Sequence, residues 1–219
     1  MPIVIYAFSL HLGRYTKIHS SISVLPMRLS HGTSSRNPRK SVLSTAFFLR
    51  HDPTQREILF FGDVEPDTLS LDPMNVSVWR TAAPKIPHAL SAIFLECSWT
   101  SERSDDELYG HLSPSHLLDE LLVLATEVWR VRTLRSSGRS LRQWMKVAAG
   151  KAVSNPSPSS EELRGILDGL TVHIIHCKSD LTSERPARYT IEKQIKDLMQ
   201  KKGLGANFLV VEQGSVLHV

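Results

Sequence analysis

STAFFLRHDPTQREILFFGDVEPD, residues 44–67, is the stretch of sequence that decides the fold. Two runs rich in β-branched and aromatic residues end at Leu49 and Phe61, and the turn-forming residues 51–56 separate them. This pattern predicts a β-hairpin with strands at 42–49 and 57–61. Both alternating sets of side chains in the first strand are largely apolar, so we expect that strand to be covered on both faces.

Further strands and two helices are predicted on either side of this hairpin. Similar apolar runs predict strands at 22–29, 92–96, 171–177, 207–212 and 215–219. Ser113 and Pro114 are typical of a helix start, and the leucines that follow form one broad stripe as far as Val128. A second helix is predicted from Pro186 to residues 201–203, where Lys-Lys-Gly is typical of a helix end. Strands that alternate with helices indicate an α/β fold.

The net charge of +4 hides a strongly uneven distribution along the 219 residues. The charge is +7 over residues 1–51, −10 over 52–129, +7 over 130–151 and zero over 152–219. A nucleic-acid-binding protein usually presents a continuous basic surface, which an acidic middle segment interrupts. We therefore expect no nucleic-acid partner.

The chain is expected to form a single domain over residues 1–219, with a basic, Ser/Pro-rich insertion at 131–160. A segment of this composition is predicted to be solvated. The alternative is that the basic residues at 130–151 bind an acidic protein partner.

The sequence shows no sign of export or of a membrane segment. The two cysteines, Cys97 and Cys177, lie eighty residues apart and fit neither a disulfide framework nor a CxxC metal site. The N-terminus has no basic residue before its apolar run and no small-residue cleavage site, so we expect no secretory signal. No stretch approaches the roughly 20 apolar residues that cross a bilayer. These features predict a cytoplasmic protein with no membrane partner.

Three residues at predicted strand or helix ends are candidates for holding a metal ion. Asp63 follows a predicted strand, and His31 and His111 each adjoin a glycine that lets the backbone turn sharply. Taken singly, each residue is typical of an ordinary turn. Together, two imidazoles and one carboxylate are the ligand chemistry of a zinc hydrolase. Glu96 and Ser98 are expected to line or support such a site.

Five short motifs occur in an order that is typical of one enzyme family: SHG at 30–32, STAFF at 44–48, FGDVE at 61–65, FLECS at 94–98 and GHL at 110–112. In these motifs the chain resembles the class II cyclic nucleotide phosphodiesterases, the low-affinity cAMP phosphodiesterase family known from fungi. The segments VHIIHCKSD and FLVVEQG, at 172–180 and 208–214, also look like that family. The resemblance begins near residue 21, reaches the end of the chain and is weakest at 131–160.

The resemblance implies a fold, a metal centre and a reaction. The family adopts the αββα sandwich of the metallo-β-lactamase type, and this chain resembles its C-terminal half, with part of the N-terminal half missing. The family carries two divalent metals, usually zinc. By resemblance, His31 matches a ligand of the first metal, His111 a ligand of the second, and Asp63 the carboxylate that bridges both. The implied reaction is hydrolysis of cAMP to 5′-AMP by a metal-bound hydroxide in cAMP-mediated signalling, with Asp63 and His111 as catalytic residues.

One motif of the family is absent from these 219 residues. A His-x-His-x-Asp-His stretch supplies four of the family's seven metal ligands, and it does not occur in this sequence. His173 and His176 are expected on a strand, where residues three apart point to opposite faces, so we do not expect them to replace it. Three ligands drawn from two metal sets are too few for a binuclear centre, and we therefore expect this chain alone to be inactive. The alternative function is that of a non-catalytic interaction protein derived from the same fold.

Overall fold

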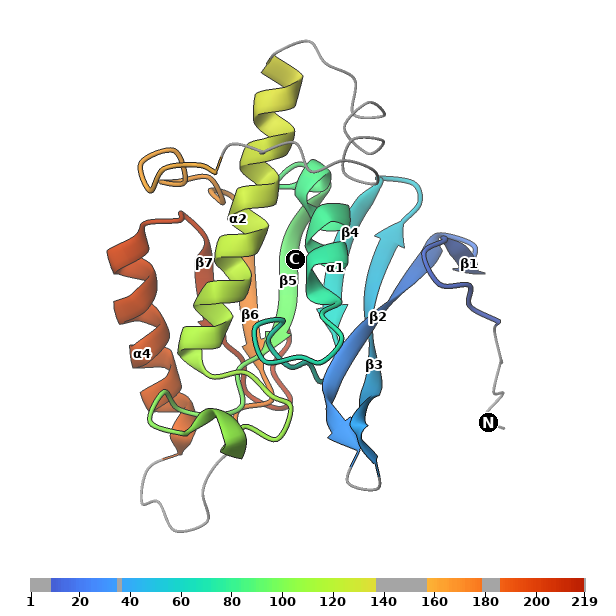
Figure 1. The fold of residues 1–219 in the computed structure, drawn as a ribbon. Helices are drawn as coiled ribbons and strands as arrows, with labels where there is room; N and C mark the ends of the chain where they lie inside the picture. The colour runs from blue at the N-terminus through green and yellow to red at the C-terminus, as the bar shows by residue number, and fades with distance from the viewer. Residues whose placement is uncertain (1–8, 35–36, 137–156, 179–185, 219) are drawn as a thin grey trace.

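A computed structural model describes residues 9–34, 37–136, 157–178 and 186–218. In this part of the chain the strands form one seven-stranded sheet, in which they follow the order of the sequence (Figure 1). Neighbouring strands from β1 to β4 pair antiparallel, and those from β4 to β7 pair parallel. The elements are β1 (Thr16–His19), β2 (Ile22–Ser34), β3 (Asn37–His51), β4 (Arg56–Phe61), α1 (Asn75–Ala82), η1 (Ala83–Lys85), β5 (Leu90–Glu96), η2 (Asp105–Glu107), α2 (Pro114–Ser136), β6 (Thr171–Ile175), α4 (Ala187–Lys202) and β7 (Asn207–Val210).

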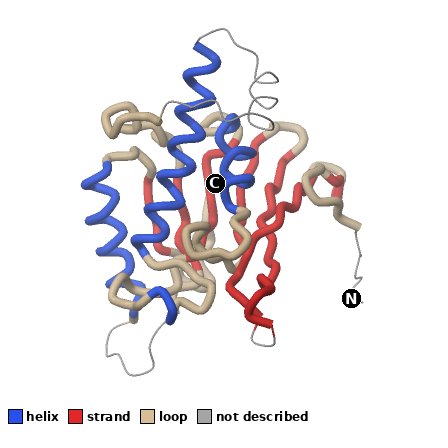
Figure 2. Tube along the Cα trace, viewed as in Figure 1, coloured by secondary structure: helices blue, strands red, loops and turns tan. Residues whose placement is uncertain are grey.

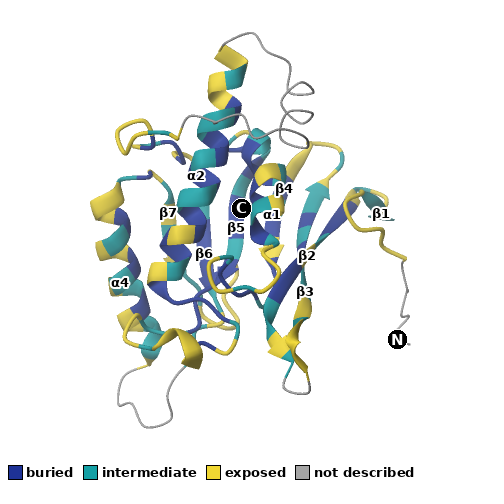
Figure 3. Ribbon diagram, viewed as in Figure 1, coloured by how far each residue is buried: buried dark blue, intermediate teal, exposed yellow. Residues whose placement is uncertain are grey.

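The α-helices of the described residues, α1, α2 and α4, cover one face of the sheet (Figures 1 and 2). They lie between neighbouring parallel strands in the sequence: α1 between β4 and β5, α2 between β5 and β6, and α4 between β6 and β7. Such crossovers are right-handed, and these strands succeed one another in a single direction across the sheet, so the helices lie on the same face. The core between helices and sheet is buried (Figure 3), and it contains Leu59, Ile93, Leu121, Val172 and Ile191.

The opposite face of the sheet carries a row of aromatic and apolar side chains. Phe60, Phe94, His173 and Leu209 are register partners on β4, β5, β6 and β7. Neighbouring rings stack, with centroids 5.7 Å apart for Phe60 and Phe94 and 4.6 Å apart for Phe94 and His173. His173 is buried, and its Nδ1 atom has no hydrogen-bond partner among the described residues. Burial lowers the pKa of His173, because the charged imidazole is poorly solvated there.

Most predicted elements agree with the structure in kind and differ in extent. The α/β class, the β3–β4 hairpin and both predicted helices are confirmed, and α2 continues to Ser136. The prediction that strand 42–49 is covered on both faces is wrong, because Val42 and Leu43 are exposed. β4 pairs only with residues 46–51 of β3, so the distal half of the β2–β3 hairpin extends beyond the layered part of the fold. The strand predicted at 215–219 is also wrong, since residues 215–218 form no strand.

Two expectations concern the basic insertion and the membrane. Residues 131–136 of the predicted insertion continue α2, and residues 137–156 lie outside the described residues. The acidic partner suggested for residues 130–151 therefore stays a prediction.

Among the helices that the structure describes, none combines the length and the apolar character that a bilayer crossing requires.

Two backbone segments cross at Gly32 and Gly110, and this crossing positions the two candidate histidines. Both glycines have positive φ values, of +67° and +78°. A Cβ atom at Gly110 would lie 2.7 Å from the backbone N of Gly32 and 2.8 Å from the carbonyl C of His31. A side chain there would push β2 and the segment before α2 apart. Without one, the rings of His31 and His111 approach to a centroid distance of 4.7 Å.

We predict that Gly110→Ala destabilises the fold by about 3 kcal/mol, because it combines a strained φ with a backbone clash. Gly13→Ala is the matched control, since Gly13 has a φ of +71° but no atom within 4 Å of an added Cβ. The free energy of unfolding of the control should fall by only about 1 kcal/mol, the cost of the strained φ. Urea unfolding followed by circular dichroism measures both losses. Equal losses in the two variants would contradict the role assigned to the crossing.

A second prediction concerns the pH dependence of stability. The pKa of His173 is lowered from 6.5 in the folded chain, so the unfolded chain binds the proton more tightly. The free energy of unfolding of the wild type should therefore fall as the pH drops below about 6.5. His173→Phe keeps a ring against Phe94 but takes up no proton, so this variant should lose less stability between about pH 7 and pH 5.

The measurement for this prediction is urea unfolding at both pH values. His88→Phe is the control, because His88 is exposed and its replacement should leave the pH dependence as in the wild type. If His173→Phe loses as much stability on acidification as the wild type, the buried imidazole is not the source of the dependence.

Candidate metal centre

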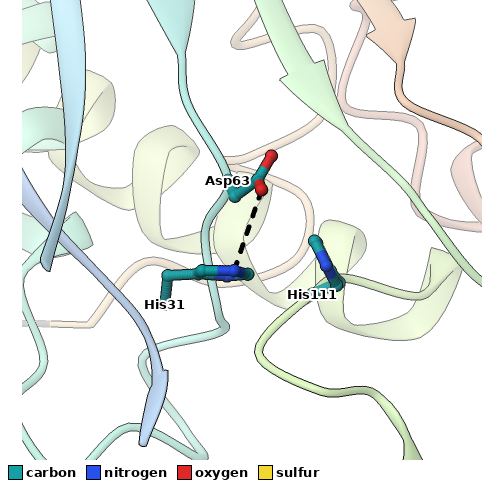
Figure 4. Close-up of side chains that lie close together, drawn as sticks. All are labelled: His31, Asp63 and His111. Carbon is teal, nitrogen blue, oxygen red and sulfur yellow. Dashed lines mark ion pairs between the residues drawn. The ribbon is translucent and has the colours of Figure 1, made fainter. Parts of the chain in front are cut away.

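The structure brings the three predicted ligands, His31, Asp63 and His111, together at one edge of the sheet (Figure 4). One candidate ligand atom of each residue lies within 4.8 Å of those of the other two. β2 and β4 run in the same direction, with His31 near the carboxyl end of β2 and Asp63 just after β4. His111 lies on the segment between β5 and α2. Binding sites of α/β proteins commonly lie at this carboxyl edge.

Hydrogen bonds hold the segments of His31 and Asp63 in place. The Nδ1–H of His31 donates to the carbonyl O of Gly110 over 2.8 Å, so its Nε2 atom is turned toward Asp63. The distance from this Nε2 to Oδ2 of Asp63 is 3.7 Å, as the dashed line in Figure 4 marks. Next to these residues, the hydroxyl of Ser30 donates to the carboxylate of Glu65, and the N–H of Glu65 donates to the carbonyl O of Ser30. Strand β2 is thus tied to the loop after β4 by Ser30 and Glu65, and to the segment before α2 by His31.

His111 is oriented by a buried carboxylate. Its Nδ1 atom lies 2.8 and 2.9 Å from the two carboxylate oxygens of Glu96, the last residue of β5. Glu96 also accepts the backbone N–H of Val64 over 2.8 Å and the hydroxyl of Ser98 over 2.5 Å. Because a carboxylate only accepts hydrogen bonds, His111 carries its proton on Nδ1 and donates it to Glu96, which leaves Nε2 as an acceptor. The expectation that Glu96 and Ser98 support the site agrees with these contacts.

His176 lies beside Asp63, against the expectation from the sequence. β6 ends at Ile175, and His176 has a φ of +58°, so the alternation of a strand does not apply to it. Its Nε2 atom is 3.8 Å from Oδ1 of Asp63, on the other carboxylate oxygen from the one that faces His31. A positive φ in a residue other than glycine is uncommon and concentrates at functional sites. The prediction that His176 lies on a strand is therefore wrong, whereas His173 does lie on the strand.

Lys178 is a further residue of the site that the sequence analysis missed. Its Nζ atom lies 2.6 Å from Nε2 of His111. The backbone N–H of Lys178 donates to the carbonyl O of Ser98, so the chain after β6 stays beside the chain after β5. The sequence held a signal for Lys178, which comes directly after the predicted strand at 171–177, much as Asp63 comes after the predicted strand at 57–61. Neighbouring parallel strands bring such residues to the same edge.

A cleft of about 500 Å³ opens beside His31 and His111. Its other walls include Thr33, Leu69 and Tyr109, so it offers both polar and apolar contacts. This volume lies within the roughly 300–1,000 Å³ that is usual for small-molecule sites.

The donor atoms at this edge suit a divalent metal ion. Imidazole nitrogens and carboxylate oxygens bind zinc at about 2.0–2.2 Å, which places two ligands of a tetrahedral ion roughly 3.3 Å apart. The Asp63 oxygens lie 3.7 Å from His31 and 3.8 Å from His176, so small side-chain rotations would bring each pair to that separation. The hydrogen bond that His111 donates to Glu96 is the usual outer support of a metal-binding histidine.

Comparison with known proteins finds relatives along almost the whole chain. The family profile of the class-II cAMP phosphodiesterases matches residues 6–214. A 3′,5′-cyclic-nucleotide phosphodiesterase of Schizosaccharomyces pombe is 32% identical over 202 residues, covering 91% of this chain and 48% of that protein. A 3′,5′-cyclic-nucleotide phosphodiesterase of Aliivibrio fischeri is 28% identical over 202 residues, covering 91% of this chain and 47% of that protein.

A solved structure supports the same relationship. Unliganded yeast PDE1 superposes with a TM-score of 0.70 and 25% sequence identity, over 94% of this chain and 48% of that chain. The predicted metallo-β-lactamase-type α/β fold is thereby confirmed. The chain spans about half the length of the curated relatives that it matches. Because the family profile covers residues 6–214, the chain belongs to the class-II cAMP phosphodiesterases.

Proposed function

We propose that this chain forms part of the active centre of a phosphodiesterase that hydrolyses 3′,5′-cyclic AMP to 5′-AMP. The observation that carries the proposal is the position of the Asp63 carboxylate, with one oxygen facing His31 and the other facing His176. A carboxylate with an imidazole on each side can hold two cations, one on each oxygen. The names of the relatives, 3′,5′-cyclic-nucleotide phosphodiesterases, support the substrate class.

The proposed ligands are His31, Asp63 and His111, as the sequence indicates, with His176 added by the structure. We propose zinc as the metal, because imidazole and carboxylate donors suit it. When bound, such a metal supplies an activated water molecule and offsets charge on the phosphoryl oxygens. Asp63 and His111 act as catalytic residues by holding it at the reacting phosphate.

The remaining residues of the site position the substrate and the ligands. The phosphate of cAMP would lie at the end of the cleft formed by His31 and His111, and the nucleoside would occupy the rest of the cleft. Hydrolysis adds water to phosphorus and breaks the bond to the 3′ oxygen, which takes up a proton. Glu96 and Gly110 hold the imidazoles in place through their hydrogen bonds, so the ligands need little rearrangement.

The proposed location of this protein is the cytoplasm. Cys97 and Cys177 are free thiols, which suits a reducing compartment. Burial raises the pKa of the Cys177 thiol to about 11, so this thiol stays protonated and resists oxidation at neutral pH.

Removal of the Asp63 carboxylate should weaken metal binding strongly. In calorimetric titrations of the chain with Zn²⁺ or Mn²⁺, we expect Asp63→Ala to lower the affinity by at least about 100-fold, because even outer supports of a metal site contribute 10–100-fold. His176→Ala should lower it by about 10-fold or more. Asp197→Ala and His88→Ala, which change exposed residues outside the site, are the controls and should bind as the wild type. Wild-type affinity in Asp63→Ala would contradict the proposed ligand set.

Incubation of the chain with cAMP and Mn²⁺ or Zn²⁺, followed by chromatographic detection of 5′-AMP, tests the reaction. The missing His-x-His-x-Asp-His stretch predicts metal binding without turnover by this chain alone. Turnover by the wild type that disappears in Asp63→Ala would establish the proposed reaction and show that the expected inactivity was wrong. Absence of both metal binding and turnover would refute the proposed function.

A further inference from the structure

The side chain of Lys178 is hydrogen-bonded to Nε2 of His111, the ring nitrogen that faces the candidate metal centre. Its Nζ atom lies 2.6 Å from Nε2 of His111, which is a short hydrogen bond. His111 Nδ1 is bonded to Glu96, so Nε2 carries a lone pair and the lysine ammonium donates to it. The same lone pair is the one that a metal ion on His111 would need.

Lysine and metal therefore exclude each other at this atom. A metal ion would lie about 2.0–2.1 Å from Nε2, along the direction that the ammonium now takes. Two positive charges so close together also repel each other strongly. Metal binding through His111 must move Lys178 away from the ring.

In the same position the ammonium makes a second contact, with the ring of Trp99. The Nζ atom lies 5.2 Å from the ring centroid of Trp99, within the range of a cation–π interaction. The backbone of Lys178 is fixed to Ser98, while its four-carbon stem can swing. The side chain can thus leave His111 without leaving the edge of the sheet.

Among the described residues, Lys178 is the basic side chain that contacts a candidate metal ligand directly. Among the described residues, the hydrogen bonds and ion pairs of His31, Asp63 and His111 involve no lysine or arginine besides Lys178. A cyclic nucleotide carries one negative charge on its phosphate, and lysine binds phosphate as a compact point charge. Through its contact with His111, which lines the cleft, the ammonium of Lys178 lies beside the end of the cleft that we assign to the phosphate.

We propose that Lys178 has two positions: in the metal-free chain it binds Nε2 of His111, and once a metal displaces it, it binds the phosphate of the nucleotide. The proposal rests on the proposed function of this site and adds the residue that recognises the anionic group of the substrate. It predicts that removal of the ammonium has opposite effects on two ligands. Metal binding should become tighter, because a competitor is lost, and phosphate binding should become weaker.

The test compares Lys178→Met with the wild type by calorimetry. Titration with Mn²⁺ alone should show about a 10-fold gain in affinity in the variant, and titration of the Mn²⁺-loaded chain with 5′-AMP or inorganic phosphate should show about a 10-fold loss. Lys178→Arg restores a cation and should recover most of the 5′-AMP affinity. Lys193→Met, on the exposed side of α4, is the control and should change neither affinity.

The opposite signs separate this proposal from a structural role of Lys178. A variant that merely folds poorly would bind both ligands more weakly, and that result would overturn the proposal, as would unchanged affinities. A higher Mn²⁺ affinity of Lys178→Met with an unchanged 5′-AMP affinity would refute the phosphate contact. Failure of the proposed function is distinct: the wild type itself would then bind no Mn²⁺, or would bind it independently of Asp63.

Discussion

The site depends on the hydrogen bonds that the buried carboxylate of Glu96 accepts. It accepts hydrogen bonds from the backbone N–H of Val64, from the hydroxyl of Ser98 and from the imidazole of His111. Val64 follows Asp63 directly, and the hydroxyl of Ser98 also lies 3.0 Å from the carbonyl O of His176. One charged group at the end of β5 therefore links three segments that carry the chemistry. Because a buried carboxylate is costly without such partners, each of these bonds also favours the folded arrangement of the others.

Strand direction explains why these segments meet. β2, β4, β5 and β6 all run the same way, so their carboxyl ends lie along one edge of the sheet. His31, Asp63, Glu96 and His176 come from these four ends. The crossing of Gly32 and Gly110 then closes the distance between β2 and the segment before α2, which no strand pairing would do. The sheet topology thus places these residues at one edge. Because Gly32 and Gly110 have no side chains, the two histidines can lie close together.

The network also orients the rings of the two candidate histidines. Glu96 fixes the ring of His111, Gly110 fixes that of His31, and the ammonium of Lys178 satisfies the remaining nitrogen of His111. The ring nitrogens are oriented before any ion arrives, which lowers the cost of ordering them on binding. The chain covers about half of its relatives' length, and these described residues nevertheless place the carboxylate of Asp63 between two imidazoles.

The sequence by itself determined the types of element, the family and three of the grouped residues. Apolar runs and turn residues predicted the strands and helices, and glycines beside His31 and His111 indicated where the backbone turns sharply. It gave no means of seeing that His176 leaves its strand, because the left-handed φ of that residue depends on the surroundings of β6 and not on local preference. The contact between Lys178 and His111 joins residues 67 positions apart. Only the pairing of β5 with β6 decides that contact, since side-chain periodicity describes neighbours along one strand and says nothing of which strands lie side by side.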